Sequence, residues 1–135
     1  MSIRCQAWVM TQTGGPEVIQ KAEIELPEPG IGQVLIRVVA AGFNPVDTKI
    51  RRTVSPSADE FKVLGWDAVG IVEQTGNDCS LFNVGDRVFY AGDISRPGSN
   101  AEYQLVDERI VGKAPHSIND AQAAALPLTS LTAWE

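Results

Sequence analysis

The sequence predicts a mainly β fold with short helices, built as a β-barrel or a β-sandwich. Short runs of β-branched and other apolar residues recur along the chain, which is typical of many short strands. Twelve glycines and eight prolines lie between these runs as turns and are not gathered into a linker. With 135 residues, of which 44% are hydrophobic, the chain has the size and composition of one domain with its own core.

Six segments are predicted as strands, in the order Ile3–Met10, 18–26, Gln33–Ala41, Asp67–Thr75, Arg87–Ala91 and 101–106. In the second segment Ile24 and Leu26 alternate with two glutamates, so one face is apolar. The third segment, QVLIRVVAA, is the strongest prediction because nearly all of its residues favour strands. Gly70 in the fourth segment indicates a bulge or a close approach of the backbone.

Two short helical stretches and the start of a third are predicted. Asn44 can cap the first stretch, and Pro45 occupies its first helical position. Near the end of the chain, Ser117 is predicted to cap a helix because an acidic residue follows three positions later, before an alanine-rich run. Pro127 ends that helix, and residues 128–135 have the pattern of the beginning of another helix.

Charge and cysteine content exclude several classes of partner. Seventeen acidic and eleven basic residues give a formal net charge of −6 and a pI near 4.7, whereas nucleic-acid binding needs clustered positive charge. Cys5, Cys79 and the single histidine, His116, lie far apart with no CxxC spacing, so they form no metal-binding motif. The sequence shows no secretory leader and no apolar run of about 20 residues. We therefore expect a cytoplasmic protein with reduced thiols and no membrane partner.

Motif spacing alone points to no reaction. The sequence contains no GxGxxG, no GxSxG and no phosphate-binding loop. The glycines of Gly30-Ile31-Gly32 precede a strand and lack a third glycine, so they are interpreted as a turn.

The ordered set of segments is more informative, namely TGGPEV, LPEPGIGQVLIRVVAAGFNPVDTKIRR, LGWDAVGIVEQTG, FNVGDRVFYAG, GSNAEYQLVDERIVGKAP and AAALPLTSLTAWE. Together these segments resemble the N-terminal, GroES-like catalytic domain of the medium-chain dehydrogenase/reductase superfamily. They are most similar to its zinc-type alcohol dehydrogenase-like and quinone oxidoreductase branch. The resemblance covers essentially the whole chain and implies a GroES-like, partly open β-barrel for residues 1–126. Residues 127–135 would begin a helix that leads into a Rossmann cofactor domain absent from this chain.

The resemblance also implies that this chain works without zinc. Zinc alcohol dehydrogenases have a cysteine ligand at the position of Asn44, a histidine ligand at Trp66 and a third ligand at Leu128. An amide, an indole and an alkyl group cannot replace thiolate or imidazole donors in a tetrahedral site. The cysteine-rich lobe that holds a structural zinc in some relatives is replaced by residues 92–100, so no metal is expected.

The activity that the resemblance implies is hydride transfer. This chain would be the substrate-side catalytic domain of a zinc-independent, NAD(P)H-dependent oxidoreductase that reduces quinones or α,β-unsaturated carbonyls. NADP(H) or NAD(H) would be bound mainly by the absent domain, and the full-length protein would be a homodimer with a small carbonyl or quinone substrate. By itself the 135-residue chain is expected to be inactive. The alternative is a non-catalytic GroES-like domain that serves as a binding or structural module.

Five residues are the candidates for this site. The catalytic candidates are Asn44, whose amide would contact nicotinamide or substrate, and Lys49, which would polarise an oxygen in place of a tyrosine of related quinone oxidoreductases. Asn44 and Thr132 are the cofactor-binding candidates, and Trp66 and Tyr90 would wall the substrate pocket. Each has a structural alternative: a helix cap for Asn44, a solvated side chain for Lys49, core or strand packing for the two aromatic residues, and a first-turn helix position for Thr132.

Two acidic residues near these candidates, Asp47 and Asp67, are expected to have structural roles. Asp47 lies in the first turn after Asn44, where its carboxylate can accept hydrogen bonds from backbone N–H groups of that turn. Asp67 takes the place of the acidic residue that follows the histidine ligand in the zinc-dependent relatives.

Overall fold

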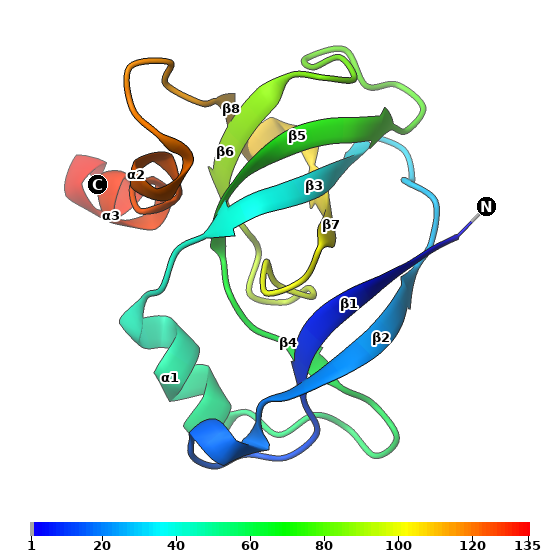
Figure 1. Ribbon diagram of the computed structural model, residues 1–135, viewed down its shortest axis with the longest axis vertical. Helices are drawn as coiled ribbons and strands as arrows, with labels where there is room; N and C mark the ends of the chain where they lie inside the picture. Colours follow the sequence, from blue (N-terminus) through cyan, green and yellow to red (C-terminus); the bar gives the residue numbers. More distant parts are fainter. Residues whose placement is uncertain (1) are drawn as a thin grey trace.

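The computed structural model describes residues 2–135 and shows two antiparallel sheets with short helices at their ends (Figure 1). One sheet has three strands in the order β2-β1-β4, and the other has five in the order β7-β3-β5-β6-β8. Over the described residues the two sheets do not join into one closed barrel. The predicted mainly β fold with short helices and an open barrel is confirmed.

The small sheet forms where an alternating sequence pattern buries one face. Strand β1 (Ile3–Met10) lies between β2 (Gln20–Leu26) and the two-residue β4 (Lys62–Val63), and all pairings are antiparallel. The buried side chains of β1 and β2 pack with Val63 and with Leu35 of the large sheet in one cluster. The glutamates of β2 lie on its exposed face, as the alternation predicts.

The large sheet is built around β3 (Gln33–Ala41), which pairs with β5 (Asp67–Thr75) on one side and β7 (Tyr103–Asp107) on the other. Strand β6 (Arg87–Ala91) pairs with β5 and with β8 (Val111–Lys113). A Cβ atom on Gly70 would lie 2.4 Å from the carbonyl oxygen of Arg37, and the register of β3 and β5 shifts between Val38 and Ala40. The predicted close approach and irregularity at Gly70 are therefore both present.

The helices lie where β3 and β8 leave the large sheet. Helix α1 (Pro45–Thr53) follows β3, and α2 (Asp120–Ala124) and α3 (Pro127–Trp134) lie together beside the β5 and β6 end of the sheet (Figure 1). Two 3₁₀ turns, Pro16–Val18 and Glu108–Ile110, complete the structure. Among residues 2–135 no helix is long and apolar enough to cross a membrane.

Several predicted boundaries are wrong, each for a local reason. Strand β2 begins at Gln20 because the residues before it form the first 3₁₀ turn, and β7 begins at Tyr103 because Ala101 makes only an isolated bridge to Ala7. Strands β4 and β8 were not predicted, since two and three residues are too short to show an alternation. Asn119, not Ser117, caps α2, because its side chain accepts from the N–H of Gln122 at 2.8 Å.

Candidate functional site

The first candidate residue, Asn44, is fixed at the junction between β3 and α1. Its backbone N–H donates to Oδ2 of Asp47 at 2.9 Å, which satisfies one free donor at the start of α1. The other carboxylate oxygen of Asp47 accepts from the N–H of Gly65, just before β5, at 2.9 Å. Asp47 therefore bonds the backbone of its own turn, as expected, and also ties α1 to the segment that leads into β5.

The side chain of Asn44 faces a second carboxylate. Its Nδ2 donates to Oδ2 of Asp67 at 2.9 Å, and Oδ1 of Asp67 accepts from the backbone N–H of Leu128, in the first turn of α3, at 2.8 Å. Asn44, Asp47 and Asp67 are 4%, 5% and 1% exposed. One carboxylate thus joins the first turns of two helices that are far apart in the sequence.

The charge of Asp67 acts on the second buried carboxylate, that of Asp47. Burial raises the pKa of Asp47 above its usual value, two backbone hydrogen bonds from Asn44 and Gly65 act against this, and the charge of Asp67 raises it further. The result is a buried polar cluster of one amide and two acids.

Lys49 and Thr132 lie on the same two helices as this cluster, but their side chains are exposed. Lys49 is in the middle of α1. Thr132 is one turn beyond Leu128 on α3, and its hydroxyl donates to the carbonyl oxygen of Leu128 at 3.0 Å. The structure therefore connects the helices that carry Asn44, Lys49 and Thr132, while the role of each side chain toward a cofactor or substrate stays a prediction.

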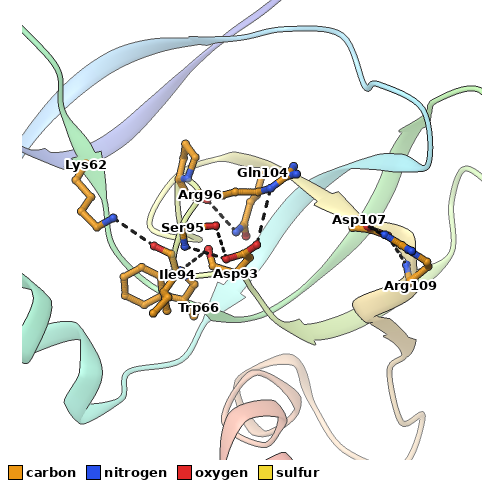
Figure 2. A network of polar contacts seen from close by, with 10 residues as sticks. Lys62, Trp66, Asp93, Ile94, Ser95, Arg96, Gln104, Asp107 and Arg109 are labelled. Carbon is orange, nitrogen blue, oxygen red and sulfur yellow. Dashed lines mark hydrogen bonds and ion pairs between the residues drawn. The ribbon is translucent and has the colours of Figure 1, made fainter. Parts of the chain in front are cut away.

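Trp66 is part of the core. It is 1% exposed and packs with Met10, Val18, Ile50 and Leu64. Its indole Nε1 donates to the carbonyl oxygen of Asp93 at 3.1 Å, as Figure 2 shows. The indole N–H is satisfied inside the domain, as is usual for a buried tryptophan.

Tyr90 is buried in the large sheet and reaches a partner that the sequence did not indicate. Its hydroxyl donates to Oε1 of Gln104 at 2.8 Å, and Nε2 of Gln104 donates to the carbonyl oxygen of Pro97 at 3.2 Å. Burial raises the pKa of Tyr90 above its ordinary range. Because Gln104 belongs to a strand adjacent to β3 and not to the neighbours of Tyr90 along the chain, no local pattern could have identified this pair.

A cleft of about 740 Å³ opens between β6, β7, β8 and the first turns of α3. Tyr90 lines it from β6, and Pro127 and Leu131 line it from α3. At the same cleft Asp107 and Arg109 form an ion pair of 2.7 Å, visible in Figure 2. Hydrogen bonds from Arg109 lower the pKa of Asp107 to about 2.

The side chains that the sequence resemblance places at zinc-ligand positions do not suit a zinc ion. Asn44 offers an amide already bonded to Asp67, Trp66 offers an indole N–H bonded to a carbonyl, and Leu128 offers an alkyl group. Within residues 2–135 no group of three or more histidine, cysteine, aspartate or glutamate side chains is arranged to hold a metal ion. The candidates that remain are a buried amide that donates to Asp67, an exposed hydroxyl that donates to the carbonyl oxygen of Leu128, and the exposed ammonium of Lys49.

Comparisons with known proteins agree on one family. Residues 30–116 match the alcohol dehydrogenase GroES-like domain. The chain is 51% identical over 109 residues to a zinc-type alcohol dehydrogenase-like protein, SACOL2177, of Staphylococcus aureus, covering 81% of this chain and 32% of that protein. It is 41% identical over 123 residues to the quinone oxidoreductase of Homo sapiens, covering 90% of this chain and 37% of that protein.

A solved structure shows the same fold. The quinone oxidoreductase from Coxiella burnetii superposes with a TM-score of 0.89 at 30% identity, covering 98% of this chain and 44% of that one. This chain therefore spans about a third of the length of the curated relatives that it matches.

Proposed function

Because the chain belongs to the GroES-like N-terminal domain family of the medium-chain dehydrogenase/reductase oxidoreductases, we propose that it is the substrate-side domain of a zinc-independent, NAD(P)H-dependent reductase. Its substrates are quinones or α,β-unsaturated carbonyls. The observation that carries the proposal is that the amide of Asn44 and the indole N–H of Trp66 are both engaged in hydrogen bonds within the domain. With Leu128, these are the residues that the sequence resemblance places at the three zinc-ligand positions.

The substrate class follows from what stabilises negative charge in this site. When bound, NAD(P)H would supply a hydride that forms a new bond to the conjugated substrate and displaces a pair of the substrate's π electrons onto its oxygen. Without a Lewis acid, that oxygen must be stabilised by hydrogen bonds or a fixed positive charge. Lys49 is one of three cations on α1, with Arg51 and Arg52 in the last turn, and its exposed ammonium supplies both a hydrogen bond and a positive charge. A proton from the solvent then completes the reduced product.

The cofactor role falls to neutral groups. The amide of Asn44 and the hydroxyl of Thr132 are of the type that exchanges hydrogen bonds with the carboxamide of nicotinamide, so these residues fit the group. Their helices are joined through Asp67, which supports a shared task at one site. The full-length protein is expected to work as a homodimer on small carbonyl or quinone substrates.

The proposal is tested on the intact polypeptide that carries these residues. Oxidation of NADPH and of NADH is followed with an ortho-quinone and with an alkenal, and alcohol oxidation is followed with NADP⁺ and NAD⁺. Stoichiometric reduction of a quinone or an alkenal by either nicotinamide supports the proposal. Turnover of alcohols alone would contradict the substrate class, and a protein that binds no dinucleotide would instead be a non-catalytic module.

A further inference from the structure

We propose that Asp67 is a positioning residue for the reduction, because its carboxylate fixes which end of the Asn44 amide is turned toward cofactor or substrate. This inference rests on the proposed function. It assigns to Asp67 a task beyond holding the fold together.

The orientation of Asn44 follows from the chemistry of its partner. An ionised carboxylate has no hydrogen to donate and can only accept. The end of the Asn44 amide that lies 2.9 Å from Oδ2 of Asp67 is therefore the NH₂ group. The carbonyl oxygen of that amide must then lie at the other end of the group, away from this oxygen of Asp67.

Asp67 is itself held too firmly to adjust. Its backbone carbonyl oxygen accepts from the N–H of Gly42 at 2.8 Å and from the hydroxyl of Ser99 at 3.2 Å. Its second carboxylate oxygen accepts from the N–H of Leu128 at 2.8 Å. With 1% of its surface exposed, Asp67 is anchored to the end of β3, to the segment before β7 and to α3, and Asn44 must conform to it.

A carboxylate is the group that this geometry requires. Two N–H donors, from Asn44 and from Leu128, converge on the two oxygens of Asp67, and both donors are neutral. Burying a charge against neutral donors costs more than burying a neutral amide. A neutral asparagine at position 67, however, has one accepting oxygen and one donating NH₂ group. Its NH₂ group would therefore face an N–H donor, either that of Asn44 or that of Leu128. The charged carboxylate at position 67 therefore sets the orientation of the Asn44 amide.

Exchanging the amide at position 44 and the carboxylate at position 67 separates the effect of amide orientation on turnover from its effect on the stability of the fold. In Asp67→Asn, the new side chain can still accept from Leu128 only if its NH₂ group faces Asn44, which forces the amide of Asn44 to turn over. In the double variant Asn44→Asp with Asp67→Asn, the same pair of groups is present with donor and acceptor exchanged. Its hydrogen bonds are all satisfied, but position 44 no longer presents an amide.

The experiment measures the thermal midpoint, kcat and KM of the intact polypeptide with NADPH and a quinone. We expect Asp67→Asn to lower kcat at least about tenfold, and the double variant to regain the thermal midpoint without regaining kcat. Glu108→Gln is the matched control, because Glu108 is also a buried carboxylate that accepts from neutral backbone groups, those of Ser80 and Leu81. It should lower the midpoint and leave kcat nearly unchanged.

Three results would overturn the inference: a double variant with wild-type kcat, a folded Asp67→Asn variant with wild-type kcat, or a Glu108→Gln variant with an equal loss of kcat. A measurement on the wild type needs no variant. The side-chain amide protons of Asn44 should exchange slowly with solvent, and exchange at the rate of a free amide would contradict the hydrogen bond to Asp67. If the wild type oxidises no NADPH, the proposed function fails instead, and this amide measurement still tests the orientation.

Discussion

Asn44 is held at both of its polar ends by acids from different parts of the chain. Asp47 accepts from its backbone N–H, and Asp67 accepts from its side chain. Helix capping and a role toward cofactor are therefore compatible, because the backbone and the side chain have separate partners. Lys49, by contrast, is exposed on the same helix.

Replacing Lys49 tests the source of positive charge. We expect Lys49→Ala to lower kcat for quinone reduction at least about tenfold, or about 1.4 kcal/mol, because the oxygen that gains charge loses its cation. The matched control is Lys21→Ala, since Lys21 is an exposed lysine on β2 of the small sheet. Steady-state kinetics of the intact polypeptide measure both. Equal kinetics for the two variants would remove Lys49 from the site.

Asp47 predicts an unusual dependence of stability on pH. Its pKa is raised in the folded state above the usual 3.8, so the folded chain binds more protons at this group than the unfolded chain does. The free energy of unfolding therefore falls as pH rises from the usual pKa to the raised one, and the loss is complete above the raised value.

In Asp47→Asn this loss disappears, although the variant also forfeits one of two accepted hydrogen bonds. We expect the stability difference between variant and wild type to move in favour of the variant as pH rises from about 4 to about 7. Urea denaturation at a series of pH values measures this difference. A difference that stays constant over that range would show that the pKa of Asp47 is not raised.

At the scale of the elements, what could be predicted depended on whether the signal was local. The bounds of β1, β3, β5 and β6 agree with the sequence prediction because each strand carries its own apolar pattern. The start of α1 is likewise predicted by a local signal, which is the capping residue Asn44 followed by Pro45 and Asp47. Strand β4, in contrast, forms because Val63 pairs with Val9, which lies in another part of the chain. A two-residue segment carries no sequence pattern that could predict this pairing.

The cap of α2 illustrates how two local signals compete. Ser117 and Asn119 are both able to cap, and Asn119 does so because its backbone N–H also donates to Oε1 of Gln122 at 3.1 Å. We expect Asn119→Ala to lower the free energy of unfolding by about 1 kcal/mol. Ser117→Ala, the control at an exposed position, should change it by less than about 0.5 kcal/mol. Chemical denaturation of both variants measures these changes. A larger loss of stability in Ser117→Ala than in Asn119→Ala would contradict the assignment of Asn119 as the cap.

At the scale of the whole molecule, the functional cluster is assembled by long-range contacts. Asp67 and Leu128 are distant in the sequence, and the hydrogen bond between them depends on how α3 packs against the start of β5. The sequence could indicate Asn44 and Asp67 as separate residues of interest. That one carboxylate connects α1 and α3 follows only from the three-dimensional fold.

Helix α3 carries exposed apolar side chains near this cluster. Trp134 is 90% exposed, and Leu131 beside it is 52% exposed. We expect the 135-residue chain to self-associate at high concentration through these side chains, and Trp134→Ala to weaken the association. Trp8→Ala, on the small sheet, is the control for loss of an exposed ring. Sedimentation velocity measures the association, and a monomer at all concentrations would contradict the expectation.

The central claim is that this domain serves hydride transfer without a metal. The most direct measurement is NADPH-dependent quinone reduction by the intact polypeptide before and after treatment with a strong chelator, together with its zinc content. With an amide, an indole and an alkyl group at the zinc-ligand positions, we expect activity to survive chelation and zinc to be substoichiometric. Activity that is lost on chelation and restored by added zinc would contradict the account.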